Sequence, residues 1–397
     1  MQNKENFSAI LFQDVILLAL AINDDGIYDS EKYTVSCSDA LDSGLAFSQN
    51  FRNIAVGTDP DCDSVFHALS AGLLSGNSNI WNIGNSTFTQ LKYAVRVSGA
   101  DGGIFIQNCR GNIKLIPCSV SGHPLLRREE AEFLDALNPD KCIVREKKGK
   151  LTDSSVFSEL YISETEKKFS RIENIPFRIN SSNPQIRKIF RNVSPVSDSD
   201  FFRDVTFNIS DDGTRVSAYS CESGFIFYEK LLLLCCTDEF EKGNDIPLPH
   251  SFPVIADKLA SEYNQNIYRY DPFSENASDI SRKDISLEYP FLYDAADLVY
   301  RILRMMTVRK RSLKELLSLI PDFTTAVKYI NINNNPEETI KHIHEKSEND
   351  VCCSHDTGRI IAKKSKSGKS LILYAESYSS ETADELCSSW LSDYGIR

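Results

Sequence analysis

The sequence lacks three features that would each assign it to a broad class of proteins. Its 11 cysteines include no Cys-x-x-Cys pair, which favours buried thiols in a reducing cytosol over disulfides or a zinc site. No apolar run reaches the roughly 20 residues of a membrane-spanning helix. Ala9–Ile22 is interrupted by Gln13 and Asp14, and we expect it to form a core helix rather than a signal peptide. A net charge of −12 excludes a broad surface for nucleic acids. These absences predict a cytoplasmic protein that binds neither membranes nor nucleic acids.

The pattern that is present is typical of an α/β protein. With 397 residues, the chain is long enough for several cores. Strands and helices alternate at short spacing over the first 130 residues, which predicts a mostly parallel, doubly wound sheet. The expected elements are a helix from Cys37 to Asn50, a strand over Asn53–Val56, a helix over Val65–Ser75 and a strand over Asn79–Ile83.

The most informative stretch runs from Gly99 to Leu115. The amphipathic helix expected over Thr89–Val97 ends at Gly99, where a left-handed residue is common. Ile104–Ile106 reads as a buried strand, Gln107–Asn112 as a polar turn and Ile113–Ile116 as a second strand. Because open α/β sheets bind ligands at the carboxyl ends of their strands, the polar turn is a candidate site.

These residues resemble the α-D-phosphohexomutases, the family of phosphoglucomutases and phosphomannomutases. Gly99-Ala-Asp-Gly-Gly-Ile104 and, beyond the loop, Ile113-Lys-Leu115 are similar to the segments that frame the family's phosphoserine loop, Thr-Ala-Ser-His-Asn-Pro. The loop is shorter here, and the resemblance places Cys109 at the position of the phosphoserine. It makes Cys109, Arg110 and Lys114 the catalytic candidates.

Two further loops depart from the family pattern. The family's Asp-Gly-Ile-Arg-Gly corresponds to Asp25-Gly-Ile-Tyr-Asp29, and its Gly-Arg-Asp-Thr-Arg corresponds to Gly57-Thr-Asp-Pro-Asp61. Three arginines are therefore replaced. Because guanidinium groups bind phosphate with two parallel hydrogen bonds, their loss argues against a bisphosphate intermediate.

The family's magnesium loop, Asp-Gly-Asp-Gly/Ala-Asp-Arg, corresponds to Ser210-Asp-Asp-Gly-Thr-Arg215. The resemblance makes Ser210, Asp212 and Thr214 the metal candidates and Arg215 a substrate-binding candidate. Mg²⁺ relies on carboxylate charge, so we expect at most weak magnesium binding and no other cofactor. The alternative is an Asp-Asp-Gly hairpin turn without a metal.

The next part of the chain contains no copy of the family's sugar-binding motif, Gly-Glu-x-Ser-Gly-His. Ser274–Glu288 occupies its place and contains neither Gly nor His. Glu275 and Glu288 are candidates for a sugar-binding carboxylate, although no motif surrounds them.

In the second expected domain, Asn183 is expected to cap a helix whose first residue is Pro184.

The C-terminal part includes a helix expected over Pro336–His344 and a Tyr-Ala-Glu strand that is similar to the family's. The loop before this strand, Lys363-Lys-Ser-Lys-Ser-Gly-Lys369, replaces the family's phosphate-binding Arg-Pro-Ser-Gly-Thr-Glu-Pro. Its hydroxyl and ammonium groups suit an anion, and a flexible lysine-rich hairpin is the alternative. The substrate-binding candidates here are Lys363, Lys364, Ser365, Ser367 and Lys369.

The resemblance covers nearly the whole chain and implies four domains. Residues 1–130, 131–235 and 236–322 are expected to form three doubly wound α/β domains, the second and third shortened, and residues 323–397 a small α+β domain. The altered loops predict a homologue with impaired catalysis, which binds hexose phosphates or other anions weakly and acts as a sensor or as a scaffold for a protein partner. Two alternatives stay open: an active mutase that interconverts hexose 1- and 6-phosphates with a rearranged site, and a structural interaction module.

Overall fold

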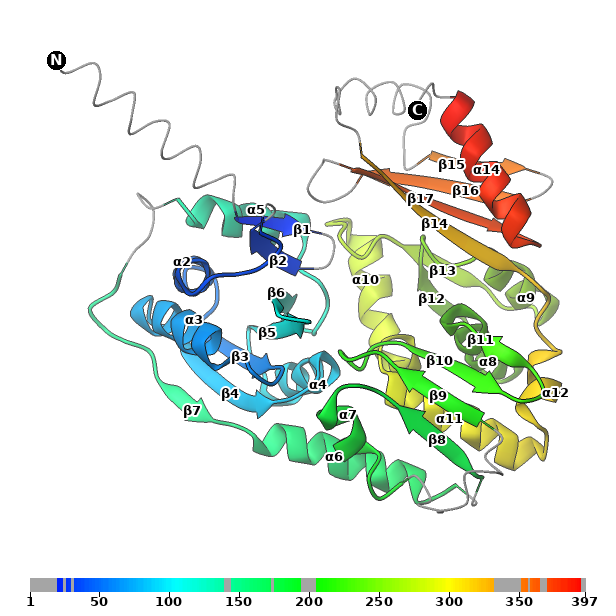
Figure 1. Ribbon diagram of the computed structural model, residues 1–397, viewed down its shortest axis with the longest axis horizontal. Helices are drawn as coiled ribbons and strands as arrows, with labels where there is room; N and C mark the ends of the chain where they lie inside the picture. The colour runs from blue at the N-terminus through cyan, green and yellow to red at the C-terminus, as the bar shows by residue number, and fades with distance from the viewer. Residues whose placement is uncertain are drawn as a thin grey trace. The chain divides into compact units, whose positions relative to one another are not determined.

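The computed structural model describes residues 20–23, 26–29, 32–138, 144–172, 175–193, 205–331, 351–355, 358–364 and 370–393. The chain divides into two compact units (Figure 1). Unit 1 consists of Met1–Leu231 and Asp271–Leu313, and unit 2 of Leu232–Tyr270 and Lys314–Arg397. The division into four domains stays a prediction.

Two expected helices fall wholly or mainly outside the described residues. The helix predicted over Pro336–His344 lies outside them altogether. Most of Ala9–Ile22 also lies outside, but its last residues belong to a strand, Leu20–Asn23. The prediction of a helix is therefore wrong at this end, because the residues pair with the next segment of the chain instead.

Unit 1 contains a seven-stranded sheet with the order β1-β2-β6-β5-β3-β4-β7. Its strands are β1 (Leu20–Asn23), β2 (Gly26–Asp29), β3 (Asn53–Thr58), β4 (Asn79–Asn85), β5 (Gly102–Cys109), β6 (Asn112–Ser119) and β7 (Leu151–Asp153). The pairs among β5, β3, β4 and β7 are parallel, whereas those among β1, β2, β6 and β5 are antiparallel. The sheet is thus mixed rather than mostly parallel, because β5 turns straight back into β6.

Helices cover both faces of this sheet (Figure 1). They are α2 (Cys37–Phe47), α3 (Asp63–Ser75), α4 (Phe88–Ser98), α5 (Arg127–Ala136) and α6 (Val156–Phe169). Alternate residues of each central strand enter two separate cores. Ile104 and Ile106 pack with α2, α3 and α5, whereas Phe105 packs with α4 and with Phe157 of α6. The apolar run of β5 is therefore buried on both faces, as in a doubly wound fold.

Helices α2 and α3 approach each other through two glycines. A Cβ atom on Gly72 would lie 2.1 Å from the carbonyl oxygen of Leu41, and one on Gly44 would lie 2.3 Å from that of Leu69. Both distances are far below van der Waals contact. The two helices can pack at this distance only because neither position has a side chain.

The remainder of unit 1 is a four-stranded sheet, β11-β10-β9-β8, with its helices. The elements are β8 (Phe177–Asn180), α7 (Pro184–Ile189), β9 (Val205–Ile209), β10 (Val216–Ser220), β11 (Gly224–Ile226), α10 (Ala277–Ile285), η2 (Ser286–Glu288), η3 (Pro290–Leu292) and α11 (Ala295–Arg309). The predicted start of α7 is confirmed. Asn183 is its N-cap and Pro184 is its first residue.

Unit 2 combines a parallel pair, β12-β13, with an antiparallel sheet, β14-β17-β16-β15. Its elements are α8 (Tyr228–Glu241), β12 (Ile246–Pro249), α9 (Ile255–Glu262), β13 (Ile267–Tyr270), α12 (Leu313–Leu317), β14 (Thr324–Asn331), β15 (Val351–His355), β16 (Gly358–Lys364), β17 (Ser370–Ser377) and α14 (Ser380–Asp393). The carboxylate of Glu376 on β17 accepts hydrogen bonds from the backbone N–H groups of Val254 and Ile255 at 2.6 and 3.0 Å. This carboxylate caps α9 from the sheet.

In the described part of the chain, no helix has the length and apolar character needed to cross a membrane.

Candidate functional site

Cys109, the catalytic candidate, is the last residue of β5. It pairs with Asn112, the first residue of β6, so only Arg110 and Gly111 connect the two strands. Both have positive φ angles, 56° and 92°, as in a type I′ hairpin turn. The polar turn predicted over Gln107–Asn112 is therefore wrong, because most of these residues belong to the ladder. The turn is too short to form a loop around a phosphoryl group.

Lys114 lies on the same face of this hairpin as Cys109, two residue pairs farther along. It pairs with Gln107, and side chains of paired residues in antiparallel strands share a face. The Lys114 ammonium lies 4.8 Å from the ring centre of Tyr28. Tyr28 is the residue that replaces the first arginine of the family pattern. Arg110 is exposed at the turn.

The turn between β9 and β10 brings the three metal candidates together. The Ser210 hydroxyl donates to Oδ1 of Asp212 at 2.5 Å, and the Thr214 hydroxyl donates to Oδ2 at 2.7 Å. The backbone N–H of Arg215 donates to Ser210 Oγ at 2.9 Å, while its guanidinium carbon lies 5.7 Å from the ring centre of Tyr228. Both carboxylate oxygens of Asp212 are thus already hydrogen-bonded within the turn.

The same turn packs against the first residues of two helices. The backbone N–H of Thr89 in α4 donates to the Asp212 carbonyl at 3.3 Å, and that of Ala295 in α11 donates to the Gly213 carbonyl at 3.0 Å. Helix N-termini carry partial positive charge and favour negatively charged groups. In the described residues, no group of three or more His, Cys, Asp or Glu side chains is arranged to hold a metal ion.

A buried carboxyl group joins these loops. Asp59 follows β3, and its Oδ2 accepts a hydrogen bond from the backbone N–H of Asn108 at 3.0 Å. Its Oδ1 accepts one from Nδ2 of Asn183 at 3.2 Å. Burial, together with the nearby charges of Asp211 and Asp212, raises the pKa of Asp59 to about 6. The carboxyl thus contacts both the β5–β6 hairpin and the start of α7.

Asn183 extends this network to the β9–β10 turn. Its Nδ2 also donates to the carbonyl of Asp211 at 2.7 Å, and its Oδ1 accepts from the backbone N–H of Gln185 at 2.8 Å. Analysis of the sequence assigned Asn183 only the role of helix cap. The one signal it offered is the residue type, since the amide of a capping Asn keeps two N–H donors free, whereas an ionised Asp has none.

A second buried carboxyl group begins α11. Asp294 caps the helix by accepting from the backbone N–H of Ala296 at 2.9 Å, and it also accepts from the hydroxyl of Tyr161 at 2.9 Å. Burial, with repulsion from Asp297, raises its pKa to about 6. Asp297 differs because it is paired with Lys168 at 2.8 Å and with Arg301 at 3.1 Å.

Replacing Asp294 by asparagine is expected to stabilise the protein at pH 7.5 and to have no effect at pH 4. A raised pKa means that the folded state binds the proton more tightly, so this carboxyl favours folding below pH 3.8 and loses that contribution as the pH rises through about 6. The lost contribution amounts to about 3 kcal/mol, and asparagine preserves the cap. Urea unfolding at both pH values measures the difference. Asp297→Asn, the control, should destabilise at pH 7.5; a gain from Asp294→Asn that does not vary with pH would contradict the prediction.

The lysine-rich loop connects β16 and β17. Lys363 and Lys364 are the last residues of β16 and pair with Ile372 and Leu371 of β17. The other candidates of this loop, Ser365, Ser367 and Lys369, lie outside the described residues. Phosphate binding by the loop therefore stays a prediction.

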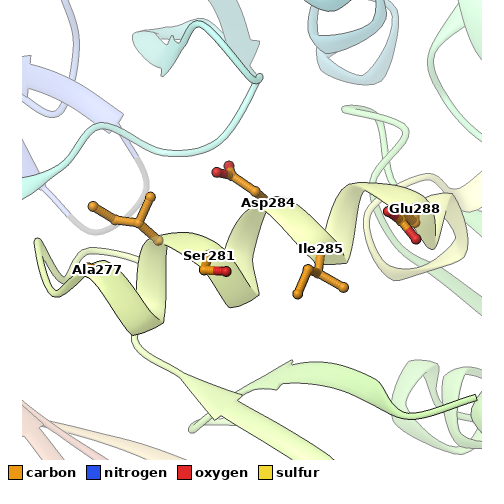
Figure 2. A pocket seen from close by; sticks show the side chains of 6 residues that line it. Ala277, Ser281, Asp284, Ile285 and Glu288 are labelled. Atoms are coloured by element: carbon orange, nitrogen blue, oxygen red, sulfur yellow. The ribbon is translucent and has the colours of Figure 1, made fainter.

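The segment Ser274–Glu288, which occupies the place of the family's sugar loop, forms α10 and η2. A groove of about 500 Å³ lies along one side of these helices (Figure 2) and is lined by Ala277, Ile280, Ser281, Asp284, Ile285 and Glu288. Its two carboxylates would repel a phosphorylated sugar. The other candidate, Glu275, accepts a hydrogen bond from the backbone N–H of Arg128 at 2.8 Å. Neither glutamate therefore forms a recognisable sugar site.

Comparison by sequence finds no relative: no protein-family model matches the chain, and no curated protein matches it. Comparison of structures does find proteins with a similar fold. A phosphoglucomutase/phosphomannomutase family protein from Burkholderia thailandensis superposes with a TM-score of 0.70 and 13% identity, over 96% of this chain and 98% of that one. The phosphoglucomutase parafusin from Paramecium gives a TM-score of 0.58 and 10% identity, over 90% and 91%.

A third similar structure was solved with ligands. It is the N-acetylphosphoglucosamine mutase of Aspergillus fumigatus in complex with GlcNAc-6P and magnesium. It has a TM-score of 0.50 and 9% identity, over 85% of this chain and 76% of that one. These likenesses extend over nearly the whole chain, although fewer than one residue in five is shared. The chain therefore has the fold of the α-D-phosphohexomutases.

Proposed function

We propose that the protein is a phosphohexomutase homologue with impaired catalysis, which retains at most weak binding of hexose phosphates or other anions and acts in the cytoplasm as a sensor or scaffold. The two-residue turn between Cys109 and Asn112 carries this proposal. Phosphoryl transfer depends almost entirely on positioning and on stabilisation of charge. A tight hairpin exposes Arg110 but offers no loop that could enclose a phosphoryl group.

The Asp212 turn supports the same conclusion. A magnesium ion at this point would have to replace the hydroxyl hydrogen bonds from Ser210 and Thr214 to the Asp212 carboxylate. It would gain only one carboxylate in return, and Mg²⁺ gives up its water reluctantly. Any magnesium binding would therefore be weak. The fungal mutase that was solved with GlcNAc-6P and magnesium suggests which ligands to test first.

Hexose phosphates are expected to raise the unfolding temperature of the full chain equally with and without Mg²⁺, and no turnover is expected. A ligand present at 100 times its dissociation constant stabilises the folded state by about 2.7 kcal/mol. The ligands to compare are hexose 1-phosphates, 6-phosphates and a hexose bisphosphate. Loss of the shift in Lys363→Ala and Lys369→Ala variants would assign the binding to the lysine-rich loop.

The same experiment separates the alternatives. A shift that requires Mg²⁺, accompanied by turnover, would contradict impaired catalysis and favour an active mutase. No shift with any sugar phosphate would favour a structural interaction module. Cys109→Ser supplies a further test, since it restores the hydroxyl but leaves the two-residue turn unchanged. We expect this variant to remain inactive, and measurable mutase activity would show that the rest of the site is intact.

A further inference from the structure

Four basic side chains gather in unit 1, between α4, the loop after β6 and α10. Lys92 and Arg96 lie one turn apart on α4, His123 lies in the loop after β6, and Lys283 lies on α10. Lys92 packs against Gly122, the neighbour of His123, and both Lys92 and Arg96 lie over the ring of Tyr293. The His123 ring is hydrogen-bonded to the backbone of Lys283, so the four residues gather at one place. We call them the Lys92 cluster. Lys283 is buried, whereas the other three residues are partly exposed.

Lys92 has no hydrogen-bond acceptor and no ion pair among the described residues. Its ammonium lies 4.7 Å from the ring centre of Phe88 and 5.7 Å from that of Tyr293. Two carboxylates, those of Asp212 and Asp294, attract it from beyond ion-pairing distance. Both are already occupied by hydroxyl donors. Burial lowers the pKa of Lys92, as expected of an ammonium group that has lost water without gaining a partner.

Arg96 is similarly short of acceptors. One of its N–H groups donates to the Tyr293 hydroxyl at 2.6 Å, and its guanidinium carbon lies 5.0 Å from that ring centre. The Tyr293 hydroxyl donates in turn to the carbonyl of Leu287 at 3.0 Å. Within the described part of the chain, no carboxylate pairs with Arg96. Its remaining N–H groups can therefore bind an anion.

His123 supplies a group of opposite hydrogen-bonding character. Its ring donates to the backbone carbonyl of Lys283, while Nε2 is buried and has no partner among the described residues. Nδ1 therefore carries the proton, and Nε2 is an acceptor without a donor. Burial, with repulsion from Lys283, Lys92 and Arg96, lowers the pKa of His123 to about 3, so the ring is neutral. A buried acceptor left unpaired is uncommon in native proteins.

We propose that the Lys92 cluster binds a small phosphate-bearing anion that also offers a hydroxyl group. Lys92 and Arg96 would bind the anionic oxygens, and the hydroxyl would donate to Nε2 of His123. Lys283 also contributes positive charge, although its own ammonium donates to the carbonyl of Pro272 at 3.3 Å and lies near Glu129, Asp271 and Asp284. A purely structural cluster would be expected to pair its cations with carboxylates, as Asp297 does with Lys168 and Arg301.

The neutral imidazole makes a specific prediction about the ligand. Hydrogen phosphate has one P–OH group, which can donate to Nε2, whereas sulfate has the same size and charge but no proton. Sulfate should therefore bind at least about fivefold more weakly, because it leaves the buried acceptor unpaired. A sugar phosphate can supply the hydroxyl from the sugar instead.

Isothermal titration of the full chain with sodium phosphate, at ionic strength fixed with sodium chloride, tests the site. Lys92→Met keeps the aliphatic stem that packs on Gly122. We expect this variant and Arg96→Gln each to weaken binding by about tenfold or more, since each removes charged hydrogen bonds. Lys147→Met, which removes one charge from an exposed position, is the matched control and should bind normally.

Three results of these titrations would overturn the proposal, and a fourth comes from a variant of the lysine-rich loop. The three are the absence of phosphate binding, full binding by a folded Lys92→Met variant, and equal binding of sulfate. If Lys92→Met does not fold, Arg96→Gln decides. Loss of binding in Lys369→Met alone would assign the anion to the lysine-rich loop and would also overturn it. Titration with glucose 6-phosphate and glucose 1-phosphate then shows whether free or sugar-bound phosphate is preferred.

Discussion

Replacing Asn183 by alanine is expected to destabilise unit 1 by about 3 kcal/mol, through two separate losses. The first is the cap of α7, which is worth about 1 kcal/mol. The second is the pair of hydrogen bonds that Nδ2 donates to Asp59 and to the Asp211 carbonyl. Asp59 is buried, so its carboxyl would lose a donor without gaining water. Urea unfolding of wild type and variant at pH 7 measures the difference.

Asn180→Ala is the matched control for this prediction. Asn180 lies three residues earlier and also donates to a side chain, the Oδ1 of Asn208 at 2.9 Å, but this hydrogen bond is exposed. We expect a loss within about 0.5 kcal/mol, as for most surface substitutions. An equal loss in the two variants would mean that the network at Asp59 contributes nothing. Asn183→Asp should be worse at pH 7 than at pH 5, because Asp59 has a pKa of about 6 and would face a second carboxylate.

Replacing Gly72 by alanine is also expected to destabilise unit 1 by about 3 kcal/mol, although alanine is the better helix former. Helix propensity alone would favour the substitution by about 1 kcal/mol. The new methyl group would lie 2.1 Å from the Leu41 carbonyl oxygen and 2.8 Å from the backbone nitrogen of Leu45. These are backbone atoms and cannot rotate away, so α2 and α3 would have to separate. Thermal or urea unfolding of unit 1 provides the measurement.

Ala71→Val serves as its control. Ala71 is the neighbouring residue of α3 and is exposed. A valine at this position adds bulk to the same helix without approaching α2. We expect only the cost of helix propensity, about 0.5 kcal/mol. If Gly72→Ala instead proved neutral or stabilising, the close approach of the two helices would not limit the packing. Gly44→Ala tests the same contact from α2.

Local features of the sequence predicted several elements correctly. Helix α4 was expected over Thr89–Val97 and runs over Phe88–Ser98, because apolar residues recur on one face and Gly99 adopts a left-handed conformation at the end. The start of α7 was correct for a similar reason, since Asn183 and Pro184 form a local signal for a helix N-terminus. Such signals depend on neighbours within one turn, so they do not require knowledge of the fold.

Long-range pairing decided the features that were predicted wrongly. Polar residues from Gln107 to Asn112 indicated a loop, but Gln107, Asn108 and Cys109 pair with β6 across the hairpin. Register with a partner strand cannot be read from one strand's composition. Likewise, Leu20–Ile22 belongs to a run that resembled a helix, yet it pairs with β2 as a strand.

The sequence by itself determined the α/β class of this protein and the positions of several helices and strands, because periodicity and caps act over short distances. It also determined where the loops depart from the family pattern that the chain resembles. Only the tertiary structure decided what those loops became: a closed hairpin at Cys109, a turn whose hydroxyls saturate Asp212, and a network through Asp59 and Asn183. It alone brought together Lys92, Arg96, His123 and Lys283, which come from three separate segments. The physical reason is that burial and hydrogen bonding between distant segments depend on packing, which no local pattern encodes.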